Sequence, residues 1–111
     1  MGIFSSKEDK AIEQIQKINR RIKMIREMMR QSPDGRLTRY NIRDAALILD
    51  ECGTFWNKYQ SYTNQMDYMQ KQLFMGATVE CWNGERIGVF LWEQYFHDAF
   101  LGLAAEVHRL S

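Results

Sequence analysis

Residues 11–29 read AIEQIQKINRRIKMIREMM, and this stretch decides the fold class of the chain. Its apolar residues recur at alternating intervals of four and three, which places them on one stripe of an α-helix. Ser6 precedes Glu8 and Asp9, so a capping oxygen and two acids stand where a helix begins. The sequence therefore predicts an amphipathic helix over about residues 6–31. Its apolar stripe consists of Ala11, Ile15, Ile18, Ile22, Ile25 and Met29.

Two further stripes follow along the chain. The same spacing runs without a break from Ala45 to Leu73 and predicts a long helix over about residues 41–74. A third stripe predicts a helix over about residues 86–110, and most of the remaining circumference of that helix is apolar too. A helix of this kind must be covered on more than one side. The third stripe consists of Val89, Trp92, Phe96, Ala99, Leu103, Val107 and Leu110.

The stretch 78–86 is ambiguous. The run Thr-Val-Glu-Cys-Trp before Asn83-Gly84 fits one arm of a β-hairpin, and it also fits a connection between helices. We favour the connection, because an isolated hairpin would have no sheet to join. The expected fold is a single all-α domain over residues 1–111, with a long antiparallel, coiled-coil-like helical hairpin and a shorter apolar third helix.

Composition limits the classes of function. The formal net charge is +1 over 111 residues, which argues against binding nucleic acid by charge. The start of the chain lacks the regions of a secretory signal peptide, and Cys52 and Cys81 stand in apolar stretches, so we expect reduced, buried thiols and a cytoplasmic location. No Gly-rich phosphate loop, nucleophile elbow or zinc signature occurs, and we expect no enzyme activity, cofactor or metal.

One short motif is suggestive. Trp82-Asn83-Gly84 stands between two predicted helices, with Phe90 following. Over residues 41–110 this arrangement resembles the W-x-G family of small helical proteins of type VII (ESX-like) secretion, and the small helical partners of type VII toxins. The resemblance implies that Trp82 and Gly84 occupy an interhelical bend. It also implies an export signal, an aromatic residue followed four positions later by an acid, and Tyr40 with Asp44 has that spacing.

These patterns predict a non-catalytic helical adaptor that binds protein and forms homo- or hetero-oligomers through helix packing. The resemblance adds export by a type VII route, as a secretion substrate or a toxin partner. The alternative is a membrane-peripheral protein, anchored by an acyl chain on Gly2 and by its basic first helix. We expect partners to contact the apolar third helix and the methionine-rich end of the second helix. The predicted partner-binding residues are Trp82, Gly84, Phe90, Trp92, Tyr95, Phe100, Met66 and Met69.

Overall fold

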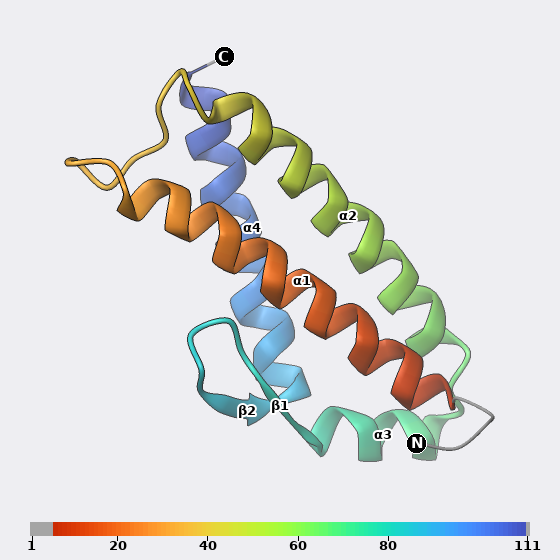
Figure 1. The fold of residues 1–111 in the computed structure, drawn as a ribbon. Coiled ribbons are helices and arrows are strands. Elements are labelled where there is room, and N and C mark those ends of the chain that lie inside the picture. The colour runs from red at the N-terminus through yellow and green to blue at the C-terminus, as the bar shows by residue number, and fades with distance from the viewer. Residues whose placement is uncertain (1–5, 111) are drawn as a thin grey trace.

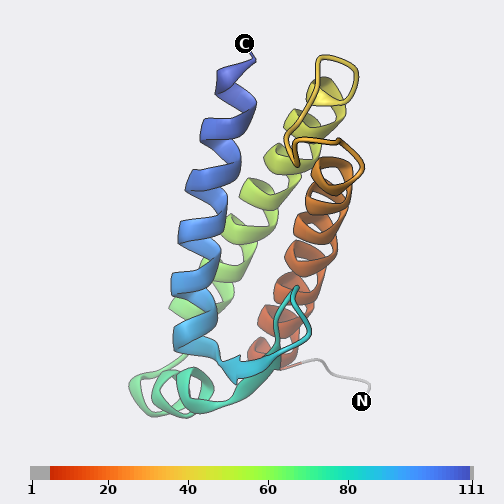
Figure 2. The same ribbon diagram turned by 90° about the vertical axis from the view of Figure 1, so that its left-hand side faces the viewer.

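The computed structural model describes residues 6–110 of the chain. Three long helices run up, down and up along one elongated body, as Figures 1 and 2 show. They are α1 (Lys7–Arg30), α2 (Ile42–Asn64) and α4 (Val89–Arg109), and they account for most of an overall length of 46 Å. The short helix α3 (Tyr68–Gly76) lies across one end of this body, next to a hairpin of β1 (Thr78–Glu80) and β2 (Arg86–Gly88). The fold is thus mostly helical, with a small two-stranded sheet.

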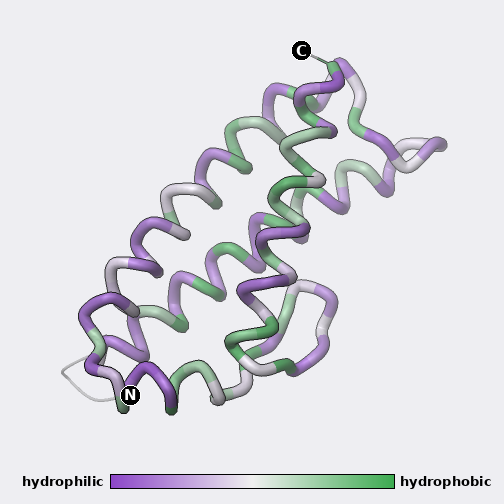
Figure 3. Tube along the Cα trace, turned by 180° about the vertical axis from the view of Figure 1, so that it is seen from behind, coloured by the Kyte–Doolittle hydropathy of each residue, from purple (hydrophilic) through white to green (hydrophobic). Residues whose placement is uncertain are grey.

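Helix α1 follows the predicted pattern. The Ser6 side chain accepts a hydrogen bond of 3.0 Å from the backbone amide of Asp9, which caps the helix start. Ile15, Ile18, Ile22 and Ile25 are all buried, and α1 packs against the antiparallel α2 along its length. Hydrophobic and hydrophilic residues alternate along both helices (Figure 3). The antiparallel helical hairpin predicted from the sequence is therefore present.

The predicted single helix over residues 41–74 is wrong, because one helix ends at Asn64 and a second begins at Tyr68. Asp67 has an extended backbone, and its side chain accepts from the Gln70 amide while the Gln70 side chain accepts from the Asp67 amide. This capping box satisfies amides at a new helix start, so a second helix begins there even though the apolar spacing continues. The chain has four helices within residues 6–110 rather than three.

Residues 78–88 form a β-hairpin, which was the less favoured of the two structures predicted for this stretch. Val79 pairs with Ile87 in an antiparallel register, and Gly84 takes a φ of +88° in the turn. The hairpin needs no larger sheet, because Val79 and Cys81 are buried in the helical core. Consequently α4 begins at Val89 rather than near residue 86, and at 21 residues it is almost as long as α2, which has 23.

Aromatic rings join α2, α3 and α4 around Trp92. The Trp92 ring stacks on Phe96 at 5.6 Å between centroids and lies 5.8 Å from the ring of Tyr59. Trp56 stacks on Tyr59 at 5.1 Å, and Phe74 brings α3 into the same cluster. Such ring pairs add to the free energy of apolar burial, so this cluster anchors α4 to the other helices.

Candidate functional site

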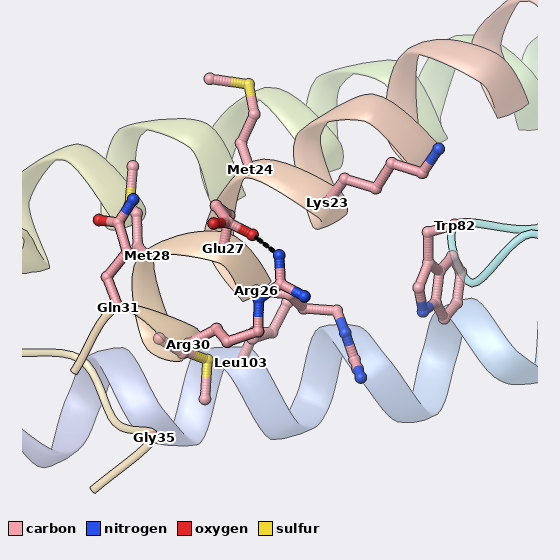
Figure 4. A pocket seen from close by; sticks show the side chains of 11 residues that line it. Lys23, Met24, Arg26, Glu27, Met28, Arg30, Gln31, Gly35, Trp82 and Leu103 are labelled. Atoms are coloured by element: carbon pink, nitrogen blue, oxygen red, sulfur yellow. Dashed lines mark hydrogen bonds and ion pairs between the residues drawn. The ribbon is translucent and has the colours of Figure 1, made fainter. Parts of the chain in front are cut away.

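An open groove lies between the C-terminal half of α1 and helix α4. It has a volume of about 940 Å³, which is within the range of pockets that bind ligands in proteins. Figure 4 shows Trp82, at the tip of the hairpin, at one end of the groove and Gly35, in the α1–α2 loop, at the other. We call it the α1–α4 groove. Its lining residues are Lys23, Met24, Arg26, Glu27, Met28, Met29, Arg30, Gln31, Gly35, Trp82 and Leu103.

The groove combines two kinds of side chain. Methionines from α1, the indole of Trp82 and the side chain of Leu103 from α4 supply apolar surface. Met24 is 46% exposed, so part of this surface faces solvent. Methionine is flexible and polarisable, which suits a surface that adapts to the shape of a partner.

Basic side chains stand beside this apolar surface. Lys23 and Arg26 make no side-chain hydrogen bond or ion pair with any residue of the described chain, whereas Arg30 pairs with Glu27. The groove therefore holds three cations and one acid, and two of the cations are free to meet an anionic ligand.

Asn19 fixes the hairpin end of the groove. Its side-chain amide donates to the Glu80 carbonyl at 2.6 Å, and its Oδ1 accepts from Nε1 of Trp92 at 2.9 Å. One buried side chain on α1 thereby ties β1 and α4 to the same helix. Because the hairpin tip carries Trp82, this link also sets where that indole stands relative to α1.

Glu106 fixes the other end. Its carboxylate accepts hydrogen bonds of 2.9 Å from Arg36 and from the Leu37 amide in the α1–α2 loop, and Arg109 on its own helix also donates to it. Arg109 further donates to the Leu37 carbonyl at 3.0 Å. Hydrogen bonds from Arg109, then from Arg36 and Leu37, lower the pKa of the Glu106 carboxyl to about 2. The loop is thus held onto α4 by a carboxylate that is charged at neutral pH.

The predicted partner-binding residues do not form one surface. Trp82 is half-buried and lines the α1–α4 groove, while Gly84 forms the turn of the hairpin that connects α3 to α4. Trp92 and Met66 have side chains that are buried in the core. Two others are largely exposed, namely Phe90 and Met69, and two are half-buried against the core, namely Tyr95 and Phe100.

The groove residues on α1 were missed. A signal was present in the sequence, since Met24 and Met28 stand off the isoleucine stripe and Lys23 and Arg26 lie beside them. Of the two methionines at the predicted end of the second helix, Met66 is buried and Met69 is exposed on α3. Tyr40 is 92% exposed and Asp44 is exposed in the first turn of α2. Gly2, the predicted acylation site, lies outside the described residues.

No group of three His, Cys, Asp or Glu side chains within residues 6–110 could hold a metal ion. Burial raises the pKa of the Cys52 thiol to about 12 and also raises that of Cys81, which disfavours the reactive thiolate. In the same range, no helix combines the length and apolar character needed to span a bilayer.

Fold and groove together define a small, mostly helical protein with an open groove that is lined by three cations and one acid. The chain belongs to the zonular occludens toxin (Zot) family, whose family model it matches over residues 4–105. Comparison with curated proteins and with solved structures gave no match.

Proposed function

We propose that this chain is a non-catalytic protein-binding module that receives a segment of a partner protein in the α1–α4 groove. The observation that carries the proposal is the groove itself, an open space of about 940 Å³ with methionine and tryptophan side chains beside unpaired cations. Aromatic, methionine and arginine side chains are enriched at protein interfaces. The Zot family description is that of a toxin, and a protein that acts by binding needs no catalytic centre of its own.

The two ends of the groove support the proposal. Asn19 and Glu106 hold the hairpin and the α1–α2 loop in place through hydrogen bonds of 2.6 to 2.9 Å. A groove built in advance costs less conformational entropy on binding than one that must form around its ligand. The methionines then supply local adaptability inside a rigid frame.

Selection of peptides from a random library tests this function without a known partner. Peptides selected on the parent protein should lose binding to Met24→Glu, which places a carboxylate on the groove wall, and to Trp82→Ala. Lys58→Glu is the matched control, because Lys58 is exposed on α2 and does not line the groove. Circular dichroism should show that all three variants fold. Peptides that bind every variant equally, or a selection that yields none, would contradict the proposal.

Export by a type VII route is a second candidate, supported by the exposure of Tyr40, just before α2, and of Asp44, in its first turn. A short export signal must be accessible to the secretion machinery, and this pair meets that condition. The test is secretion of the chain from a host with a type VII system, compared with the Tyr40→Ala variant. Loss of export in that variant alone is the expected result, and equal export would refute the assignment.

A further inference from the structure

The cations of the groove belong to a longer row along α1. Arg20, Lys23, Arg26 and Arg30 are spaced by three, three and four residues, so they follow one side of the helix. A second groove of about 490 Å³, between α1 and the hairpin, is lined by Arg20 and Lys23 and shares Lys23 with the α1–α4 groove. The row therefore runs past both grooves.

Acidic residues do not balance this row. Arg86 from β2 lines the second groove and brings the cations along the two grooves to five, while the acids that line them are Glu27 and Glu80. Glu27 is already paired with Arg30. The side chains of Arg20, Lys23 and Arg26 form no hydrogen bond or ion pair in the part of the chain that is described. A ligand with negative charges along this side of α1 would meet them without breaking an internal ion pair.

The apolar wall beside the row limits the class of ligand. Met24, Met28 and Leu103 offer no hydrogen bonds to a phosphate backbone, and Trp82 alone of the lining residues provides an aromatic ring. Single-stranded nucleic acids use a series of aromatic rings for stacking. A ligand that matches both features of the groove is apolar on one side and acidic beside it. The distance from Arg20 to Arg30, about 15 Å at 1.5 Å per residue, corresponds to about three helical turns.

We propose that the segment bound in the α1–α4 groove is an amphipathic helix of a different protein, with acidic residues flanking its apolar stripe. This inference rests on the proposed function and names the class of partner. The apolar stripe packs on the methionines and Trp82, and the acids reach Lys23 and Arg26, with Arg20 next in the row. Helices bind to grooves in this way through apolar residues at helical spacing.

Designed peptides test the charge of the partner. One probe is an amphipathic helix with a leucine stripe flanked by glutamates, and its twin carries lysines in place of the glutamates. Fluorescence anisotropy should show that the full chain binds the acidic peptide, that affinity falls as salt is raised, and that the twin binds at least about tenfold more weakly. A third peptide, with serines in place of the leucines, should also bind weakly, since it lacks the apolar stripe.

Charge reversal provides the sharper arm. Lys23→Glu combined with Arg26→Glu should weaken the acidic peptide by at least about tenfold and strengthen the lysine twin. A variant that had simply lost its fold would bind neither peptide. Lys58→Glu, again the control, should behave like the parent in both titrations.

The outcomes separate the two proposals. If both peptides bind the parent equally and Met24→Glu weakens both, groove binding stands and the acidic partner is refuted. If neither peptide binds and the library selection also yields no peptide, both the acidic partner and the proposed function are refuted. If the chain binds a polyuridylate more tightly than the acidic peptide, the proposal that its ligand is a protein is refuted. If light scattering shows that the parent self-associates and that the charge-reversed variant does not, the partner is a second copy of this chain and the proposal of a different protein is refuted.

Discussion

Nε1 of Trp92 donates a hydrogen bond of 2.9 Å to Oδ1 of Asn19, across 73 positions of the chain. Trp92 is fully buried, and the Asn19 amide turns in the other direction to reach the Glu80 carbonyl at 2.6 Å. Three elements that meet at the hairpin end of the groove therefore depend on one side chain. This link and the Glu106 contacts at the far end connect stability of the fold to the shape of the groove.

Asn19→Ala should lower the free energy of unfolding by about 2–4 kcal/mol, because it leaves the Trp92 indole N–H and the Glu80 carbonyl without their partner. Urea denaturation measures the change. Gln14→Met is the matched control on the same helix, since Gln14 is buried but its Oε1 accepts no hydrogen bond from the described residues. The control should change stability by less than about 1 kcal/mol. Equal losses in both variants would refute the bridging role of Asn19.

Trp82→Ala and Trp92→Ala should differ sharply. Trp92 is in the core and its truncation is expected to cost about 3–5 kcal/mol, whereas Trp82 is half-buried at the groove and should cost less than half as much. Thermal melting by circular dichroism gives the comparison, and peptide anisotropy reports the groove. The expected signature of Trp82→Ala is lost binding with a modest fall in melting temperature. A melting temperature as low as that of Trp92→Ala would show that Trp82 is a core residue instead.

Acid should loosen the α1–α2 loop. The pKa of Glu106 is lowered from 4.5 to about 2, so its contribution to stability is present above pH 4.5 and is lost as the pH falls toward 2. Glu106→Gln should lower stability by about 1.5–3 kcal/mol at neutral pH, because hydrogen bonds to a charged group are lost. It should also remove part of the decline in melting temperature below pH 4.5. Asp98→Asn serves as the control that removes an exposed acid of α4. An unchanged acid profile in Glu106→Gln would argue against the clamp.

Two glycines should respond in opposite ways to alanine. Gly84→Ala should destabilise the chain by about 1 kcal/mol or more, since its φ of +88° is strained for a residue with a Cβ atom. Gly53 lies inside α2, and a Cβ there would meet nothing within 4 Å. Gly53→Ala should stabilise by up to about 1 kcal/mol through higher helix propensity. Denaturant unfolding decides both, and a stabilising Gly84→Ala would exclude the turn geometry described above.

The amphipathic helix α1 could be predicted almost to the residue. Its apolar stripe, its Ser6 cap and its acids at the first turn are all local features, and local features act over one or two turns of the chain. The break before α3 was missed although its signal was also local. Asp67 followed three residues later by Gln70 marks a helix start, but the unbroken apolar spacing from Ala45 to Leu73 favoured one long helix.

The hairpin and the groove could not be predicted in the same way. The strands Thr78–Glu80 and Arg86–Gly88 depend on the burial of Val79 and Cys81 in the core and on Asn19, which binds the Glu80 carbonyl from 61 positions away in the chain. Trp82 was singled out from the sequence, but its place in the groove depends on where the hairpin packs.

By itself, the sequence determined the helical class, the amphipathic first helix and the surplus of apolar residues in the last one, since periodicity and capping act between residues close in the chain. Only the tertiary structure decided which of those residues are buried. Trp92 lies in the core, whereas Lys23, Met24 and Arg26 line the groove, because burial depends on which elements pack against each face. The surface of the groove is formed by packing between segments that are distant in the chain, so its lining depends on three-dimensional distance rather than on spacing in the sequence.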